Sequence, residues 1–297
     1  MRVATWRRDL GRKALLAVPY AWLVLFFLLP FLIVAKISLS ESRVGIPPYE
    51  PMVQADGLHV TAQGFAQLFV DDLYVGAYLN SLTIAGLATL LCLLIGYPMA
   101  LAIARAREDR RGPLLMLVIL PFWTSFLIRV YAWMGILKDE GLLNHLLMAL
   151  GLISEPLVIL NTDIAVYVGI VYSYLPFMVL PLYATLEKLD PSLLEAAADL
   201  GARPWRAFLS VTLPLSVPGI VAGSLLVFIP AVGEYVIPGL LGGGDTNMLG
   251  TALWDVFSLT RDWPGAAALA VAMLAALVVP IAVFQRLQSR LEREGER

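Results

Sequence analysis

The sequence contains a single cysteine, two histidines and few charged residues, and each shortage excludes a class of site or partner. Cys92 has no second cysteine to pair with, so we expect no disulfide within the chain and a small hydrophobic role instead. His59 and His145 lie far apart without a cysteine beside them, which argues against a metal site. The net charge of −2 and the lack of a Lys/Arg-rich arm argue against a nucleic-acid partner.

The chain also lacks the patterns of nucleotide-binding and catalytic sites. No G-x-x-x-x-G-K-[ST] phosphate loop occurs, and the GGGD run at 242–245 is an isolated glycine cluster. No His/Ser/Asp or H-x-x-x-H constellation occurs either, so a membrane enzyme has no support. We therefore expect a chain that is not an enzyme and binds no cofactor, so that any ATP must be bound by a separate polypeptide.

Apolar residues, in contrast, are abundant. Hydrophobic residues make up 59% and charged residues 15% of the 297 positions, and the mean hydropathy is +0.79. Soluble domains average roughly 45–50% apolar and about 25% charged residues, so the composition predicts a membrane protein in contact with the lipid bilayer. A window of about 19 residues predicts an all-α membrane protein with six transmembrane helices in one domain, 1–297. The spans cover about 14–38, 78–104, 113–137, 163–186, 214–236 and 265–286.

The first span follows a basic leader, a pattern shared by signal peptides and first transmembrane helices. Its length is close to the roughly 20 residues that cross a bilayer. No small-x-small cleavage site follows it. An uncleaved first transmembrane helix is therefore the preferred interpretation.

Lysine and arginine gather on one side of the predicted spans and determine the expected orientation. That side has Arg2, Arg7, Arg8, Arg12, Lys13, Arg105, Arg107, Arg110, Arg111, Lys188, Arg203, Arg206, Arg286, Arg290, Arg293 and Arg297. The opposite loops, at 39–77, 138–162 and 237–264, have only Arg43, Lys138 and Arg261. By the positive-inside rule, both termini and the loop at 187–213 face the cytoplasm.

The loop at 187–213 has the local signals of two short helices. Asp190 is a helix N-cap with proline at the first helical position after it, and Gly201 suits a left-handed C-cap. Pro204 can open a second helix, which Pro214 should end or kink. One face of the first helix has Leu193, Ala197 and Leu200, and another has Ser192, Glu195 and Asp199. Periodicity alone leaves open whether this is a solvated loop helix or a docking element for a soluble partner.

Motif spacing distinguishes these two interpretations. Glu195-Ala196-Ala197, three residues, Gly201, nine residues and then Val211-x-Leu213-Pro214 resembles the EAA motif of permease subunits of bacterial ABC importers. The family usually has isoleucine where this sequence has Val211.

The resemblance extends over nearly the whole chain, tails excepted. The segments at 17–41, 46–57, 120–144, 166–183, 226–243 and 261–270 are similar to the polyamine-importer branch, most closely to first permease subunits of putrescine importers. This implies a type I ABC importer permease fold in a bacterial inner membrane, with putrescine as the expected substrate. It also implies the partners: a second, homologous permease subunit, two copies of a cytoplasmic ATPase that binds ATP and Mg, and a periplasmic polyamine-binding protein.

In that family the EAA helix is the coupling helix, which seats in a groove of the ATPase. The resemblance therefore implies an ATPase-coupling role for Glu195, Ala196, Ala197 and Gly201, with Asp199 on the face of Glu195. Closure of the ATPase dimer on ATP would then switch the bundle from inward- to outward-facing.

Acidic and aromatic residues near the spans are candidates for the substrate path, because a polyamine needs ion pairing and cation–π contact in a low dielectric. Glu234, beside Tyr235 at the outer end of the fifth span, is interpreted either as a path residue or as a solvated interfacial acid. Arg129 should lie near the outer interface and snorkel, with a gate or a pairing with Glu234 as the alternative. The aromatic candidates, each of which could also be an interfacial belt residue, are Trp123, Tyr131, Trp133, Tyr167, Tyr172 and Tyr174.

Two alternatives stay open at this point. The same role could serve spermidine or another organic cation. An ion-coupled secondary transporter is disfavoured, because it would need no coupling loop and because no matched pair of interrupted helices is apparent.

Overall fold

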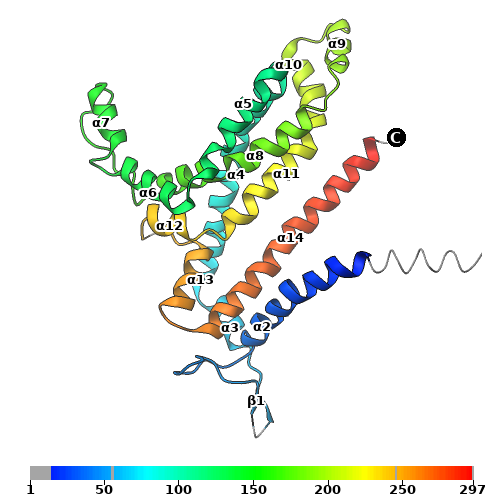
Figure 1. Cartoon of the computed structure of the whole chain (residues 1–297). Helices are drawn as coiled ribbons and strands as arrows, with labels where there is room; N and C mark the ends of the chain where they lie inside the picture. Colours follow the sequence, from blue (N-terminus) through cyan, green and yellow to red (C-terminus); the bar gives the residue numbers. More distant parts are fainter. Residues whose placement is uncertain (1–14, 55–56, 245, 296–297) are drawn as a thin grey trace, which may run out of the picture. The chain divides into compact units, whose positions relative to one another are not determined.

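The computed structural model describes residues 15–54, 57–244 and 246–295, which are mostly helical, as predicted (Figure 1). Its internal contacts define two compact units. The first comprises Met1–Asp72 with Leu253–Ala276, and the second comprises Leu73–Ala252 with Leu277–Arg297. The basic cluster at 2–13, together with Ala14 and Arg297, lies outside the described residues.

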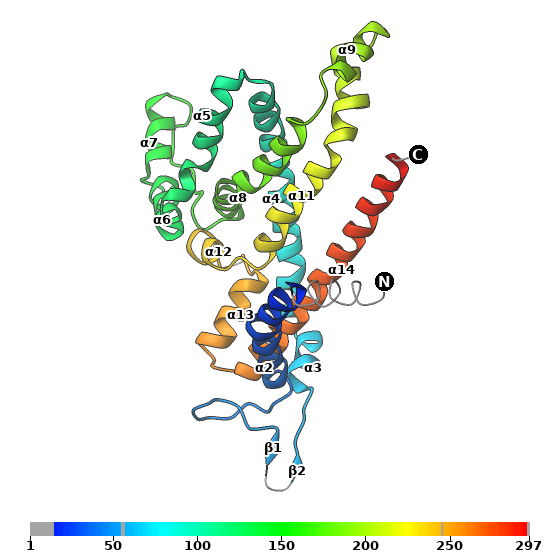
Figure 2. The ribbon, with the colours of Figure 1, turned by 45° about the vertical axis from the view of Figure 1, so that its right-hand side comes forward.

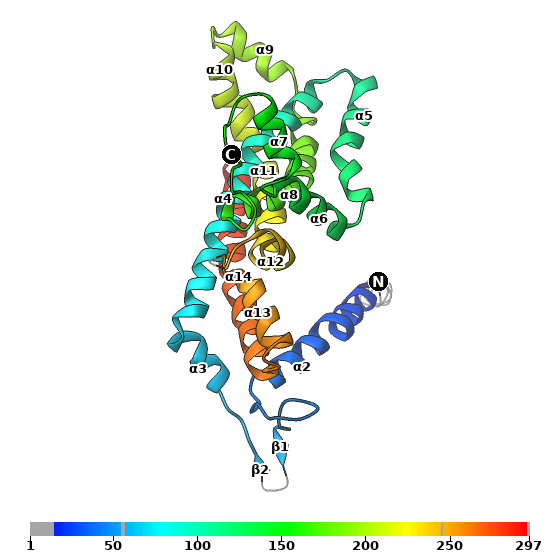
Figure 3. The same cartoon turned by 90° about the vertical axis from the view of Figure 1, so that its left-hand side faces the viewer.

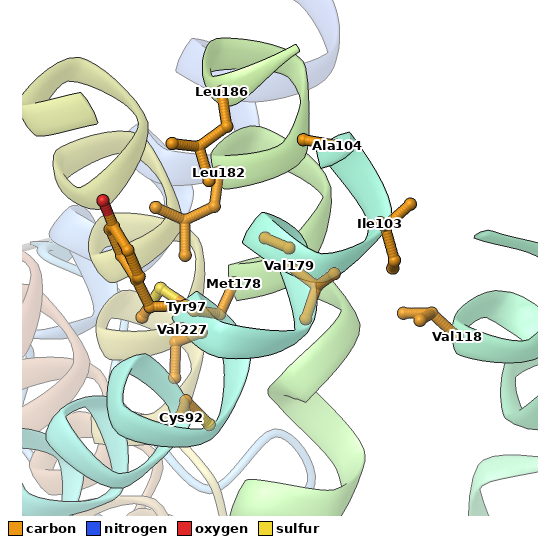
Figure 4. Close-up of a cluster of buried hydrophobic side chains, with 11 residues drawn as sticks. Cys92, Tyr97, Ile103, Ala104, Val118, Met178, Val179, Leu182, Leu186 and Val227 are labelled. Carbon is orange, nitrogen blue, oxygen red and sulfur yellow. The ribbon is translucent and has the colours of Figure 1, made fainter. Parts of the chain in front are cut away.

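Three long helices form the framework of the second unit. They are α4 (Asp72–Arg105), α8 (Asp163–Leu186) and α11 (Leu213–Val232). α8 and α11 form the most extensive helix pair, and α4 lies beside them (Figure 1). Side chains from α4, α8 and α11, together with Val118 of α5, meet in a common core around Met178 and Leu182 of α8 (Figure 4).

α4 presents mainly small residues to this core. Its buried positions recur every three or four residues and therefore lie on one face of the helix. They are Ala77, Ser81, Ile84, Ala85, Ala88, Cys92, Gly96, Tyr97, Ala100, Ile103 and Ala104. Leu79, Leu90 and Leu94 are exposed on other faces. Lipid is as apolar as the core, so close packing of small residues decides which face is buried. Cys92 is free and buried there, as predicted.

The predicted third span is not one straight helix. α5 (Glu108–Ile119) leads into a 3-10 turn, η2 (Leu120–Trp123), and the chain then turns before α6 (Phe126–Leu137). The two halves are bent by 89° (Figure 3). Pro121 lies at the start of the 3-10 turn, and Thr124 after it is extended, so the helical hydrogen-bond ladder stops there. The helix predicted at 113–137 is therefore interrupted at 124–125, and its crossing of the membrane stays a prediction.

The predicted fifth span begins ten residues earlier than expected. α10 (Pro204–Ala207), a π-helical turn, η3 (Phe208–Thr212), and α11 follow one another as one helix of 29 residues. Pro204 opens this helix, as predicted. Of the two predicted effects of Pro214, an end of the helix does not occur, and a wider π turn just before the proline rearranges the carbonyls that its ring would otherwise meet. The helix stops at Val232, four residues before the predicted limit.

Shorter helices connect the framework. α9 (Ser192–Asp199) and α10 join the C-terminal end of α8 to α11, whereas α12 (Val236–Leu241) packs on the first half of α8 at Gly169, away from α9 (Figure 2). α7 (Leu142–Ala149) lies in a segment predicted as a loop. Its buried Asn144 donates to Leu157 O and accepts from the Leu157 N–H, both at 2.9 Å, which explains why this segment is ordered.

The first unit has a long apolar helix and a small hairpin. Residues Leu15–Ile37 are helical, with a π turn, η1 (Val24–Leu28), before α2 (Leu29–Ile37). The antiparallel strands β1 (Val53–Gln54) and β2 (Gly57–Leu58) pair Gln54 with Gly57. The remaining helices are α3 (Gln63–Val70) and parts of α13 (Leu249–Ser258) and α14 (Trp263–Gly295). Trp263 stacks on Tyr49 and Phe257.

Among the described residues, four helices are long and apolar enough to cross a membrane, and the bent pair would make a fifth. The four are Leu15–Ile37, Asp72–Arg105, Asp163–Leu186 and Pro204–Val232. The sixth predicted span, 265–286, falls within α14, whose described apolar stretch, Trp263–Val278, is shorter. α4 starts six residues before the predicted second span, with Asp72 in its first turn, where a negative charge favours a helix.

Candidate functional site

The α9–α10 hairpin (residues 192–207) begins with the predicted cap. Asp190 Oδ1 accepts a hydrogen bond from the Ser192 N–H at 2.9 Å, and Pro191 occupies the turn between them. The backbone N–H of Leu194 then bonds to Pro191 O at 3.0 Å, which starts the helical ladder. The N-cap read from the sequence is therefore present.

Gly201 ends α9 in the left-handed conformation, with φ of +79°. Its N–H donates to Ala198 O at 2.8 Å, and the Ala202 N–H donates to Ala197 O at 3.0 Å. These two bonds define a Schellman motif, in which the residue at the glycine position needs a positive φ. The predicted role of Gly201 as a C-cap is confirmed.

The residues of the EAA motif lie on the surface of α9. Glu195, Ala196 and Asp199 are exposed, and Ala197 is half-buried. The ion pairs found among the described residues involve neither carboxylate. The face expected to hold Leu193, Ala197 and Leu200 is covered only in part, because Leu194 takes the inward position and Leu200 is 89% exposed.

An apolar hollow lies beside the C-terminal end of α9. It has a volume of about 540 Å³ and is lined by Leu200, Gly201, Ala202, Trp205, Arg206, Leu209 and Ser210. Leu200 and Trp205, the latter 55% exposed, border it, and the Arg206 guanidinium lies 5.2 Å from the Trp205 ring centre. Adjacent exposed apolar residues of this kind are typical of a protein-binding surface.

Basic residues gather at the same end of the second unit. Arg111 of α5 pairs with Glu187, just after α8, at 3.3 Å, and its Nε donates to Ala106 O at 3.0 Å. Arg105, Arg111 and Asp190 line one pocket of about 340 Å³ below α9. The basic loop after the second predicted span is thus beside the hairpin.

The N-cap of α9 should depend on pH. The hydrogen bond from the Ser192 N–H lowers the pKa of the Asp190 carboxyl below its ordinary value. The cap is therefore complete above the unfolded pKa of about 3.9 and is lost as the pH falls through the lower folded-state pKa. We expect amide exchange of residues 192–194, corrected for intrinsic rates, to accelerate as the pH falls below about 4, through the lowered pKa of Asp190. Asp190→Asn caps without titrating, and an equal acceleration in this variant would contradict the assignment.

A second site lies between the broken helices, away from the hairpin. An open pocket of about 450 Å³, here called the Glu234 pocket, has walls from η2, α6, α8, α11 and the start of α12. It is lined by Phe122, Phe126, Arg129, Ser173, Tyr174, Phe177, Pro230, Gly233, Glu234, Tyr235 and Val236. Irregular backbone within a membrane is tolerated where it is buried or lines a cavity, and the chain breaks at 124–125 and 233–235 both adjoin this pocket.

Glu234 is held by neutral donors only. Its side chain is 8% exposed. Oε2 accepts from the Tyr174 hydroxyl at 2.5 Å. Oε1 accepts from the backbone N–H groups of Tyr235, Val236 and Ile237 at 3.2, 3.0 and 3.3 Å. The negative charge is thus hydrogen-bonded but has no cation paired with it among the described residues.

Glu234 does not have the exposure of a carboxylate in water, because its side chain is 8% exposed. Its partner Tyr174 is the twelfth of the 24 residues of α8, a helix long and apolar enough to cross a membrane. A path role for Glu234 stays a prediction that this burial favours over a freely solvated acid. α11 starts earlier than the predicted fifth span and stops at Val232, so Glu234 follows the helix and is not part of it.

Arg129 lines the same pocket and contacts the chain on both sides of the bend. Its Nη1 donates to Pro121 O at 2.7 Å, and its guanidinium carbon lies 5.0 and 5.8 Å from the ring centres of Phe122 and Phe126. Its Nε is buried without a hydrogen-bond partner in the described part of the chain. The 89° bend turns α6 away from the line of α5, so a residue count from Pro113 does not give the depth of Arg129, and snorkelling stays a prediction.

The structure brings together only some of the candidates for the substrate path. Glu234, Tyr235, Arg129 and Tyr174 line the pocket. Trp123 and Tyr131 are exposed outside it, and Trp133 packs edge-on against Tyr172 at 5.3 Å. Tyr167 does not line the pocket either. Sequence reasoning missed Phe122, Phe126 and Phe177. Phe126 is three residues from Arg129 and Phe177 is three from Tyr174, so helical spacing could have indicated these two. Phe122 lies across the break at Thr124, and no local spacing indicates it.

Comparisons with known proteins agree with this architecture. The family model of binding-protein-dependent transport system inner membrane components matches residues 13–294. The chain belongs to this family. The chain is 41% identical to the Haemophilus influenzae spermidine/putrescine transport system permease protein PotB over 96% of both chains. It is 40% identical to the Escherichia coli (strain K12) protein of the same name, over 93% of this chain and 97% of that protein.

A solved structure shares the fold. It is the bacterial alginate ABC transporter in complex with its alginate pentasaccharide-bound periplasmic protein, with a TM-score of 0.72 at 19% identity over 96% of both chains. The predicted ABC importer permease fold is thus confirmed. The family consists of membrane components of transporters, so the chain is a non-catalytic membrane subunit, as predicted.

Proposed function

We propose that this chain is one of two homologous permease subunits of an ATP-driven polyamine importer in a bacterial inner membrane. The observation that carries the proposal is the 41% identity, over 96% of both chains, to a spermidine/putrescine permease. Two cytoplasmic ATPase subunits and a periplasmic polyamine-binding protein complete the transporter. The lipid bilayer surrounds it, and no nucleic acid is involved.

The α9–α10 hairpin is the surface on which the ATPase docks. Its exposed EAA residues, Glu195, Ala196, Ala197 and Asp199, supply polar and small contact positions, and Gly201 fixes the turn that ends the helix. The hollow beside Leu200 and Trp205 offers apolar area for the same partner. ATP-driven movement therefore enters this subunit at the C-terminal end of α8.

The hairpin, and with it both termini, faces the cytoplasm in this proposal. Arg105 and Arg111 lie beside the hairpin, as the positive-inside rule requires for a cytoplasmic end.

Putrescine is the substrate that the sequence resemblance favours, and the relatives at 40–41% identity carry both spermidine and putrescine in their names. The deciding measurement is ATP hydrolysis by the complete complex in nanodiscs with purified binding protein. We expect stimulation by putrescine-loaded binding protein that exceeds stimulation by the spermidine-loaded form. The reverse order would move the assignment to spermidine. No response to either, together with a response to another ligand, would reject a polyamine importer.

An ion-coupled secondary transporter has no support from the family match. Uptake by this chain alone in liposomes under an ion gradient, without ATP, would favour it.

A further inference from the structure

The Glu234 pocket contains the groups that bind an organic ammonium. It has one carboxylate whose hydrogen-bond partners are all neutral, and aromatic rings from η2, α6 and α8 stand around it. Carboxylates and aromatic faces stabilise a cation out of water by ion pairing and cation–π contact. The volume of about 450 Å³ exceeds what a single side chain needs, and it lies within the roughly 300–1,000 Å³ typical of small-molecule sites.

The same pocket already contains one cation, Arg129. Its guanidinium lies over Phe122 and Phe126, 5.0 and 5.8 Å from the ring centres, and its Nη1 is tied to Pro121 O. Nε, however, is buried without a hydrogen-bond partner in the described residues, so the guanidinium is only partly satisfied. Arg129 and Glu234 line one pocket, yet no ion pair joins them. Glu234 is therefore a carboxylate that no cation of the described residues neutralises.

We propose that the Glu234 pocket binds one protonated amine of the transported polyamine against Glu234, and that Arg129 is the internal cation that competes with this amine for the carboxylate. The proposal rests on the proposed function for the identity of the transported substrate. It goes further by assigning the residue that holds the amine, the residue that opposes it and the number of amine groups held.

The charges in the pocket explain why a single amine is held. One carboxylate can neutralise one ammonium, and the guanidinium nearby repels a second positive group in this low-dielectric setting. The other end of a polyamine must therefore point out of the pocket. Arg129 also limits how tightly the amine binds, which a transporter needs because a substrate held too strongly is not released.

Binding is measured on the complete complex in nanodiscs, without binding protein and without nucleotide, as the shift of the unfolding temperature with ligand concentration. Three probes share a four-carbon chain: butane-1,4-diamine, butylamine and butane-1,4-diol. We expect both amines to stabilise the wild-type complex and the diol to have no effect. Sodium chloride at matched ionic strength corrects for screening. Stabilisation by the diol equal to that by the amines would overturn the proposal.

Two charge-removing variants should shift the half-saturating amine concentration in opposite directions. Glu234→Gln keeps an oxygen for the three backbone N–H groups, loses the charge and makes the Tyr174 hydroxyl an acceptor instead of a donor. We expect the concentration to rise roughly tenfold or more. Arg129→Gln keeps a donor for Pro121 O, and we expect the concentration to fall roughly threefold or more, because the competing cation is gone. Arg129→Lys keeps the charge and should stay near the wild-type value.

Matched controls separate these effects from general changes of charge. Glu155→Gln and Arg110→Gln remove exposed charges outside the pocket and should leave amine binding unchanged. An unchanged half-saturating concentration in Glu234→Gln, or a rise in Arg129→Gln, would overturn the proposal. If the wild-type complex responds to polyamine-loaded binding protein but the Glu234 variant binds amines normally, the proposed function stands and only this inference fails. If the wild type responds to no polyamine in the ATPase assay, the proposed function fails.

Discussion

Replacing Gly201 with valine should reduce ATP-driven uptake by the assembled transporter about tenfold or more. Gly201 has a φ of +79°, and an L-residue in that region costs roughly 1–2 kcal/mol, with more for a β-branched side chain. Because nothing lies within 4 Å of an added Cβ, the cost comes from the backbone and not from crowding. Relief of the strain would unwind the Schellman motif and displace Leu200, which borders the proposed docking hollow.

The measurements are uptake in proteoliposomes and co-purification of the ATPase subunit. Gly201→Asn should keep most of the activity, because asparagine tolerates the left-handed region. Gly76→Val is the matched control: Gly76 lies in α4 with nothing within 4 Å of an added Cβ and with no positive φ. Normal uptake by Gly201→Val would argue against a role of this turn in coupling.

Replacing Gly223 with valine should destabilise the second unit by about 1–3 kcal/mol, the usual range for overpacking a tight contact. An added Cβ at Gly223 would stand 2.8 Å from Met178 Sδ and 3.1 and 3.2 Å from the Met178 backbone O and Cα. The sulfur can move aside but the backbone cannot, so α8 and α11 would have to separate. Gly219, one turn away, faces Thr185 and Pro181 O just as closely.

The lower stability is measured by unfolding the purified subunit in mixed micelles with increasing amounts of SDS. Gly86→Val is the control, because Gly86 lies in α4 with nothing within 4 Å of an added Cβ. We expect the midpoint of Gly223→Val to fall clearly below that of Gly86→Val. Equal midpoints for the two valine variants would contradict the close contact of α8 with α11.

The sequence predicted the ends of a helix correctly where one residue type determines the cap. Asp190 and Gly201 marked the ends of α9, and each makes the hydrogen bonds that its cap requires. Long apolar runs likewise predicted α4 and α8, because a membrane-spanning segment needs length and little charge.

The breaks within the predicted spans could not be predicted from the sequence in the same way. A hydropathy window of about 19 residues does not resolve the extended backbone at Thr124 or the end of α11 at Val232, because it averages over the apolar residues on both sides. Proline was not a consistent signal either: Pro121 lies at the bend, whereas the helix continues through Pro214. The surroundings of Glu234 depend on both breaks and on its bond to Tyr174, 60 residues away in the chain, which no local pattern contains.

The π turn η3 has a consequence for the direction in which the hairpin faces. A π turn is an α-helical turn with one residue inserted, and each residue of an α-helix advances about 100° around the axis. The extra residue is taken up within the π turn itself, because a π turn winds through a smaller angle per residue than an α turn. Removing one residue from Phe208–Thr212 would therefore restore a regular helix and leave Leu200 and Trp205 facing nearly the same way relative to α11. A one-residue change within a regular part of α11 would instead rotate the hairpin by about 100°. The hairpin thus keeps its direction despite the additional residue at this turn.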